Sequence, residues 1–141
     1  MIVIHYMKAL LFVSCFFLFP LSKSRLTVEV KSIPNENGTI FIGLFRKKDE
    51  FPVFGKQYIG KIIPVSGKKM TYTFNELADG QYALAIFHDE NKNGKLDKNY
   101  LGIPTEAYGF SNNARRTFSA PSFEEAEISL KSDLTISITL K

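Results

Sequence analysis

The feature that most constrains the fold is a series of short runs in which apolar and polar residues alternate. In the first run Leu26, Val28 and Val30 alternate with polar residues, and later runs of the same kind cover residues 70–75, 81–88, 125–130 and 134–140. A period of two is typical of strands with one buried and one solvated face. The sequence therefore predicts an all-β protein: a single antiparallel β-sandwich of about seven strands, immunoglobulin-like or transthyretin-like, with one long ordered loop.

Two further strands are predicted from other patterns. Residues 39–45 are apolar on both sides, as in a central strand, and an edge strand is expected over 57–63 because Pro52 and Pro64 limit its hydrogen bonding. No run after the N-terminal segment has a convincing 3.6-residue period. Ser132-Asp133 predicts a tight hairpin turn between the last two strands.

The strand over 81–88 has two different faces. Tyr82, Leu84 and Ile86 lie on one side, whereas the other side carries two small residues and Phe87. Small residues at Ala83 and Ala85 indicate that something packs closely on that second face.

Residues 1–24, MIVIHYMKALLFVSCFFLFPLSKS, have the pattern of a secretory signal peptide. The apolar run 9–19 follows Lys8 and is shorter than the roughly 20 residues of a membrane-spanning helix. Cys15 precedes four apolar residues instead of a polar tether, which argues against a lipoprotein. We expect cleavage near Ser24, a β-sandwich domain over 25–141, a secreted or periplasmic location and no transmembrane span in the mature chain; Met7 is an alternative initiator.

Cysteine and charge exclude other classes. Cys15 is the only cysteine, so the mature chain has no disulfide framework and depends on its hydrophobic core. The chain has 18 Lys and Arg against 14 Asp and Glu, and two of the basic residues, Lys8 and Lys23, lie in the leader. The remaining net charge of about +2 does not indicate a nucleic-acid partner.

The segment after the 81–88 strand has the spacing of a calcium loop. Asp89, Asn91, Asn93 and Asp97 place side-chain oxygens at positions 1, 3, 5 and 9, with Gly94 at position 6. Lys95 at position 7 would contribute its backbone carbonyl. The sequence thus nominates Asp89, Asn91, Asn93, Lys95 and Asp97 as metal ligands.

The loop departs from an EF-hand in one respect. Position 12 is Tyr100 instead of glutamate, and no helical pattern flanks the segment. Calcium affinity would then be weak, roughly 10⁻⁴ to 10⁻³ M, with Glu106 as an optional further ligand. The alternative interpretation is a polar loop without an ion, since Asp, Asn and Gly also favour Asx turns. Both interpretations stay open at this point.

Several motifs carry a family resemblance, over GQYALAIFHDENKNGKLDKNYLGIPTEAYGFSNN (80–113) and PSFEEAEISL (121–130). These segments resemble the bacterial domain-of-unknown-function family 2141. The resemblance implies an exported β-sandwich and no particular activity. The Gly80-Gln81-Tyr82 entry into a strand is also similar, over a shorter stretch, to transthyretin-like and carboxypeptidase regulatory-like domains, which mostly act as attached modules.

Two functional classes follow. One is a non-catalytic structural or binding module for an extracytoplasmic ligand or protein, with calcium stiffening the loop. The other is a small envelope hydrolase acting on glycans or peptides with His88 and Glu106, although no nucleophile elbow surrounds Ser111. Within 102–113, Tyr108, Asn112 and Asn113 suit either a binding surface or a lid whose polar side chains satisfy the backbone. With one histidine in the mature chain, zinc is not expected.

Overall fold

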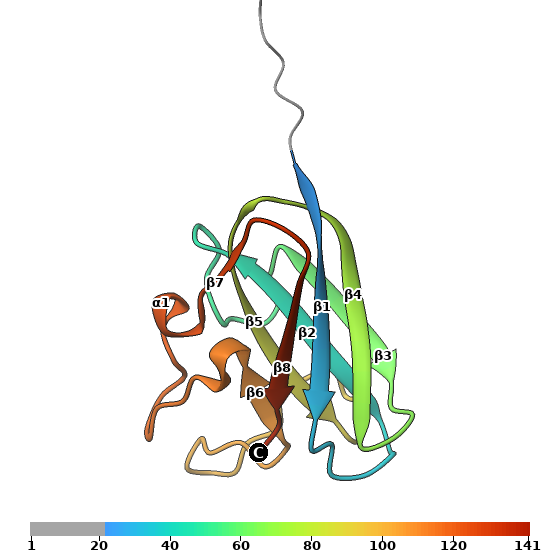
Figure 1. The fold of residues 1–141 in the computed structure, drawn as a ribbon. Coiled ribbons are helices and arrows are strands. Elements are labelled where there is room, and N and C mark those ends of the chain that lie inside the picture. The colour runs from blue at the N-terminus through green and yellow to red at the C-terminus, as the bar shows by residue number, and fades with distance from the viewer. Residues whose placement is uncertain (1–21) are drawn as a thin grey trace, which may run out of the picture.

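The computed structural model describes residues 22–141, which form two β-sheets that face each other (Figure 1). Sheet A has three strands in the order β4-β1-β8: β4 (Lys69–Ala78), β1 (Lys23–Lys31) and β8 (Leu134–Thr139). Sheet B has five strands: β3 (Ile59–Pro64), β2 (Thr39–Arg46), β5 (Gly80–Asp89), β6 (Tyr108–Phe110) and β7 (Ile128–Leu130), the last two both pairing with β5. The predicted all-β sandwich is confirmed, and β3 is an edge strand.

The main core lies between the sheets and follows the alternation in the sequence. Leu26, Val28 and Val30 of β1 are at most 1% exposed, and they belong to the same cluster as Leu84 and Ile86 of β5. Burying such side chains contributes about 1.5–3 kcal/mol each to folding. The described chain contains no cysteine, so no disulfide within it adds to this stabilisation.

A second hydrophobic cluster covers the outer face of sheet B. Ala83 of β5 packs with Phe45, Phe110 and Phe123, and Phe51 meets Phe45 edge-on at 5.2 Å between ring centroids. The prediction that something packs closely on the alanine face of β5 is therefore confirmed at Ala83, whereas Ala85 is only partly buried.

A single helical turn, α1 (Phe123–Ala126), supplies part of this cover. Ser122 and Glu125 form a capping box, in which each side chain accepts a hydrogen bond from the other residue's backbone N–H. The predicted strand over 125–130 is wrong in its first residues, because Glu125 and Ala126 are helical and pairing starts only at Ile128. These residues form a helical turn instead of a strand because the capping box satisfies their backbone N–H groups locally.

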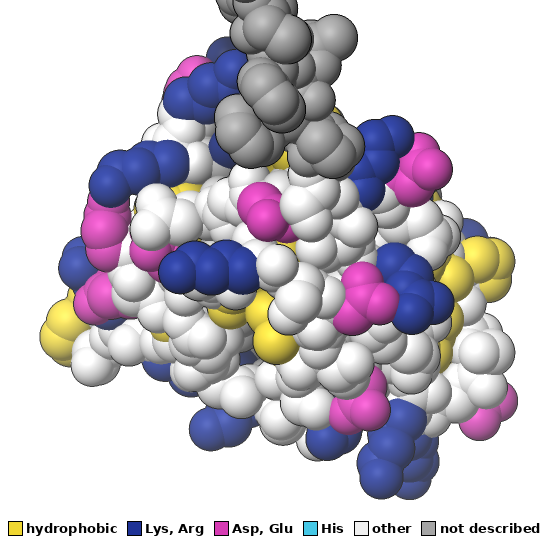
Figure 2. Space-filling view, turned by 45° about the horizontal axis from the view of Figure 1, so that its top comes forward, with side chains coloured by type: hydrophobic (Ala, Val, Ile, Leu, Met, Phe, Trp, Pro, Cys, Tyr) yellow, Lys and Arg dark blue, Asp and Glu magenta, His cyan; other side chains and the backbone are white. Residues whose placement is uncertain are grey.

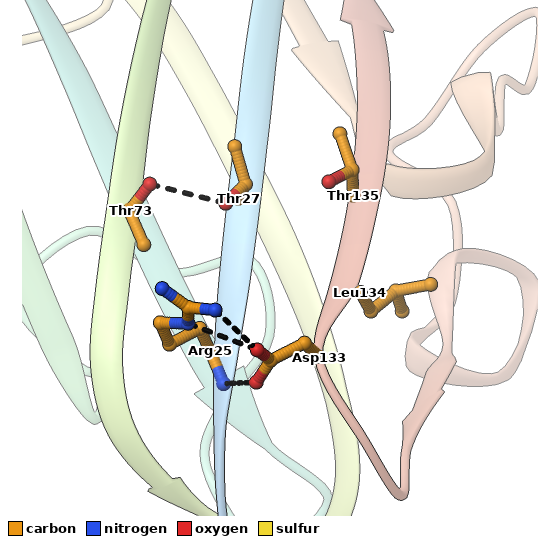
Figure 3. A pocket seen from close by; sticks show the side chains of 6 residues that line it. All are labelled: Arg25, Thr27, Thr73, Asp133, Leu134 and Thr135. Atoms are coloured by element: carbon orange, nitrogen blue, oxygen red, sulfur yellow. Dashed lines mark hydrogen bonds and ion pairs between the residues drawn. The ribbon is translucent and has the colours of Figure 1, made fainter.

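The predicted hairpin at Ser132-Asp133 is wrong. β7 pairs with β5 in sheet B, whereas β8 pairs with β1 in sheet A, so this turn carries the chain from one sheet to the other. The crossing makes β8 run parallel to β1, the one exception to the predicted antiparallel pairing among the described strands. Asp133 anchors it by accepting hydrogen bonds from the Arg25 guanidinium at 2.7 and 2.9 Å and from the Arg25 backbone N–H at 2.8 Å (Figure 3).

The predicted signal peptide falls outside the described residues except for Ser22–Ser24, and β1 already begins at Lys23. Among the described residues there is no helix with the length and apolar character needed to cross a membrane.

On the face seen in Figure 2, Lys and Arg side chains are intermixed with Asp and Glu and few hydrophobic side chains show, in keeping with the small net charge.

The Arg25–Asp133 contact predicts a pH dependence. Hydrogen bonds from the Arg25 side chain and backbone hold the pKa of the Asp133 carboxyl below its usual value. A lowered folded-state pKa adds stability above the unfolded pKa of about 3.9, and this stability is lost as the pH falls through the folded value. Asp133→Asn should therefore lower the Tm slightly at pH 7, and the difference from wild type should vanish in acid. Melting curves from pH 7 down to pH 2 check this.

Glu76→Gln is the matched control, since it removes one exposed contact to Lys23 at 3.3 Å. It should change the Tm less than Asp133→Asn does at pH 7. An Asp133→Asn deficit that persists unchanged at low pH would contradict the assignment to the charged carboxylate.

Candidate functional site

The polar loop (residues 90–107) leaves the end of β5 through Asp89. The Asp89 carboxylate accepts hydrogen bonds from the backbone N–H groups of Asn93, at 3.0 Å, and Gly94, at 2.8 Å. Gly94 has a φ of +76°, so the chain turns back sharply where the sequence has its glycine. Asp89 is 5% exposed, and its charge therefore lies at the buried base of the loop.

Asp97 closes the loop from the other side. Its two carboxylate oxygens accept hydrogen bonds from the side-chain amides of Asn91, at 2.6 Å, and Asn93, at 2.8 Å. The backbone N–H of Lys95 donates to the Asn93 amide oxygen at 2.9 Å. The structure thus brings Asp89, Asn91, Asn93 and Asp97 together in one turn through their side chains. Lys95 joins them through its backbone N–H and not through the carbonyl that the sequence nominated.

Glu106 folds back onto this turn and ties its two ends together. One carboxylate oxygen accepts the backbone N–H of Glu90 and the other accepts the backbone N–H of Asp97, each at 2.9 Å. Glu106 is 7% exposed. Glu106 therefore fastens the backbone at the two ends of the turn.

The donor set fits a hard cation. Among residues 22–141 no three His, Cys, Asp or Glu side chains gather closely enough for a metal, so an ion here would use two carboxylates with amide and carbonyl oxygens. Such an all-oxygen set suits calcium better than a transition metal. The Asn91 and Asn93 amides present nitrogen to Asp97, so each would rotate to present oxygen to an ion. The residues fit weak calcium binding.

His88 is a structural residue. It is fully buried, its Nε2 lies 2.6 Å from the carbonyl oxygen of Asn37, and its Nδ1 has no hydrogen-bond partner but lies 3.7 Å from a Glu90 oxygen. The backbone N–H of His88 donates to Ala107 at 2.8 Å. The side chain therefore holds the β1–β2 turn (residues 32–38) against the start of the polar loop and has no surface for a substrate.

The 108–113 segment also satisfies the backbone. Ser111 is fully buried, donates to the carbonyl of Ala126 and accepts the N–H of Leu84 at 2.9 Å, so it is not a free nucleophile. The Asn112 amide donates to the carbonyl of Glu127 at 2.8 Å, and the Asn113 oxygen accepts the N–H of Thr139 at 2.9 Å. These contacts match the lid interpretation, with one correction: Tyr108–Phe110 is a strand of sheet B, not part of a loop.

Beside the polar loop lies a cleft of about 630 Å³ on the outer face of sheet B. Ala85 lies in its floor, between Phe41 and Phe87 on one side and Phe110 on the other. One wall comes from the 51–57 segment through Phe54, whose ring lies 4.9 Å from that of Phe41. The opposite walls come from the apolar side of the polar loop and from residues 116–120. A second, smaller hollow of about 260 Å³ lies beside Arg25. The guanidinium of Arg25 already donates hydrogen bonds to Asp133 there (Figure 3).

Two cations belong to the cleft lining. Arg116 is paired with Glu125 at 2.8 Å, and hydrogen bonds from the Ser122 backbone and from Arg116 hold the pKa of the Glu125 carboxyl below its usual value. Lys98 makes no ion pair within the described part of the chain. The lining includes no Asp or Glu from residues 22–141. The cleft is therefore apolar with a positive bias.

With the geometry in place, comparison with known proteins identifies the family. A family described as "Uncharacterized protein conserved in bacteria (DUF2141)" matches residues 28–137, which is most of the chain. The chain belongs to this family. Searches of curated proteins and of solved structures found no match. Membership in DUF2141 confirms the resemblance predicted from the motifs and assigns no activity.

Sequence reasoning found the polar side of this DUF2141 site but missed the cleft. The sequence pattern indicates that the whole segment is polar, because Asn, Lys and Gly surround Leu96, Leu101 and Ile103. A usable signal was present: apolar residues on both sides of the loop glycine Gly102, in a segment without strand periodicity, point to a surface outside the core.

The Glu106 contacts predict a stability effect. In Glu106→Gln one oxygen can still accept a backbone N–H, but the new NH₂ group faces the other donor, so a partly buried N–H loses its acceptor. We expect a loss of about 1–3 kcal/mol in the free energy of unfolding, measured by chemical denaturation. Glu124→Gln, at an exposed position, should change it by less than about 0.5 kcal/mol. Equal effects of the two variants would contradict the fastening role.

Gly38 in the β1–β2 turn gives a second test. Its φ is +73°, and a Cβ there would overlap the carbonyl oxygen of Asp89. Gly38→Ala should therefore cost more than about 2 kcal/mol of unfolding free energy. Gly55→Ala has a similar φ of +86° but open space around the new methyl group, so it should cost about 1 kcal/mol. If the two losses are equal, the turn does not pack on Asp89 as described.

Proposed function

We propose that this protein is an exported, non-catalytic binding module, secreted or periplasmic, whose polar loop is stabilised by a calcium ion. The observation that carries the proposal is the position of the loop: one side gathers Asp89, Asn91, Asn93 and Asp97, and the other side is a wall of the apolar cleft. A cation that orders the first side also fixes the second. The leader-like segment 1–24 supports export.

The binding part rests on the cleft. A cavity of about 630 Å³ lies within the range of roughly 300–1,000 Å³ typical of small-molecule sites, which are mostly apolar with a few polar groups. The residues that the hydrolase alternative requires are engaged in the fold. His88 and Ser111 are fully buried, and both Glu106 oxygens accept hydrogen bonds from backbone N–H groups. A residue with no exposed surface cannot reach a substrate.

The calcium part rests on charge and on donor chemistry. Asp89 and Asp97 both point into one turn, and their hydrogen-bond donors there are all uncharged amides. A divalent ion would replace the Asn91 and Asn93 donors on Asp97 and offset the mutual repulsion of two carboxylates. Two carboxylates and no bidentate glutamate at position 12 correspond to weak binding, roughly 10⁻⁴ to 10⁻³ M.

Thermal melts in calcium and in chelator test the ion. At about 10 mM calcium a site of this affinity adds roughly 1.4–2.7 kcal/mol, which corresponds to a Tm increase of about 5–12 °C. Asp97→Asn should abolish that increase while leaving the chelator Tm near the wild-type value. Asp97 is preferred to Asp89 as the test position because it accepts only side-chain amides, so the substitution spares the backbone contacts.

Glu36→Gln is the control for removal of a nearby charge. It lies in the β1–β2 turn, is exposed, and should keep the full calcium response. Magnesium should give a much smaller shift, because it demands octahedral geometry and dehydrates reluctantly. Identical melts in calcium and chelator would remove the ion from the proposal.

A further inference from the structure

The rim of the cleft exposes apolar side chains that the fold itself does not require. Phe54 is 52% exposed, Leu101 67%, Ile103 56% and Phe118 99%, and all four line the same cleft. They come from three separate connections between strands, so their convergence is set by the tertiary fold. Contiguous exposed apolar surface of this kind is usually a site of interaction.

The floor of the cleft includes one small residue of the sheet. Ala85 is only partly buried, whereas the space over its pairing partner Gly43 is filled by the rings of Phe41 and Phe45. On either side, Phe41 pairs with Phe87 and Phe45 pairs with Ala83. The result is a furrow with aromatic sides, which suits a narrow flexible apolar chain better than a flat protein surface.

The charges of the cleft lining indicate which charge an apolar ligand should carry. Lys98 is the one lining cation without an ion pair in the described chain, Arg116 is shared with Glu125, and no described carboxylate lines the cleft. An anionic group near Lys98 gains attraction without a competing acid, whereas a cationic group finds no partner. Since only one cation is unpaired, a single negative charge is the best match.

We propose that the cleft binds a single-chain amphiphile with a monoanionic head group, of the fatty-acid type, with the tail over Ala85 and the head near Lys98. The inference rests on the binding function proposed above and names its ligand class. A volume of about 630 Å³ accommodates one molecule of small-ligand size. The concave aromatic furrow favours this occupant over a bilayer surface, which would need a convex apolar tip.

Calorimetric titration of the purified full-length protein tests the proposal, using amphiphiles below their critical micelle concentrations. The probes are dodecanoate, octanoate, dodecanol and dodecyltrimethylammonium. Dodecanoate should bind about a hundredfold more tightly than octanoate, since each buried methylene contributes roughly threefold to fourfold. Dodecanol should bind more weakly than dodecanoate, and the cationic amphiphile most weakly of the chain-matched probes.

Three variants locate the ligand. Ala85→Leu fills the floor and should weaken dodecanoate at least tenfold; Phe54→Ser, at a half-exposed rim position, should weaken it several-fold and serves if Ala85→Leu does not fold. Lys98→Gln should weaken dodecanoate about threefold to tenfold and leave dodecanol unchanged. Lys61→Gln, an exposed lysine of β3 outside the cleft, should change neither.

The outcomes separate this inference from the calcium-loop proposal. Tail-dependent dodecanoate binding that Ala85→Leu or Phe54→Ser weakens supports the inference, even if the melts show no calcium effect. A calcium-dependent Tm without dodecanoate binding overturns the inference and leaves the calcium loop standing. Binding unchanged in the cleft variants, equal affinity for the cationic amphiphile, or flotation with lipid vesicles without binding of monomeric dodecanoate each overturn it.

Discussion

The structure depends on one strand, β5, being covered on both faces. Its inner face, with Tyr82, Leu84 and Ile86, belongs to the core between the sheets, and its outer face packs under aromatic rings and α1. The same strand pairs with β2, β6 and β7 and ends at Asp89. The polar loop therefore leaves from a strand that is paired along both of its edges. The strand fixes the start of the loop, and the contacts of Asp89, Asp97 and Glu106 offset the entropic cost of ordering the rest.

The alternation of apolar and polar residues predicted the strands and their faces because period-two burial is local. It identified β1, β4 and β5 and the covered alanine face. Strand pairing is not local, and there the sequence failed: Ser132-Asp133 has hairpin chemistry, yet the pairing with Arg25, 108 residues away, takes the chain across to the other sheet. The helical turn at Phe123 was readable from Ser122 and Glu125, a three-residue spacing that strand periodicity obscured.

The candidate site divides in the same way. The spacing of Asp89, Asn91, Asn93 and Asp97 is a property of one short segment, so the convergence of their side chains could be predicted. From the sequence, Glu106 was only an optional further ligand, and its contacts with the backbone could not be predicted. They depend on how residues 98–105 turn back, which the hydrogen bond from the Thr105 N–H to the Asp97 carbonyl fixes. The cleft could not be predicted, since its aromatic residues come from β2, β5, β6 and two loops whose proximity follows from sheet order.

The two sides of the polar loop share one short stretch of backbone. Leu96 and Lys98 of the cleft wall flank Asp97, whose carboxylate closes the oxygen-rich turn and whose backbone N–H is held by Glu106. If a cation orders the turn, as proposed above, a ligand in the cleft has less conformational freedom of the loop to remove on binding. By linkage, a ligand that orders the wall must then strengthen cation binding by the same factor. Because the hydrogen bonds of Asp89, Asp97 and Glu106 already order the polar side, such coupling would act on the exposed apolar side of the loop, around Leu101 and Ile103.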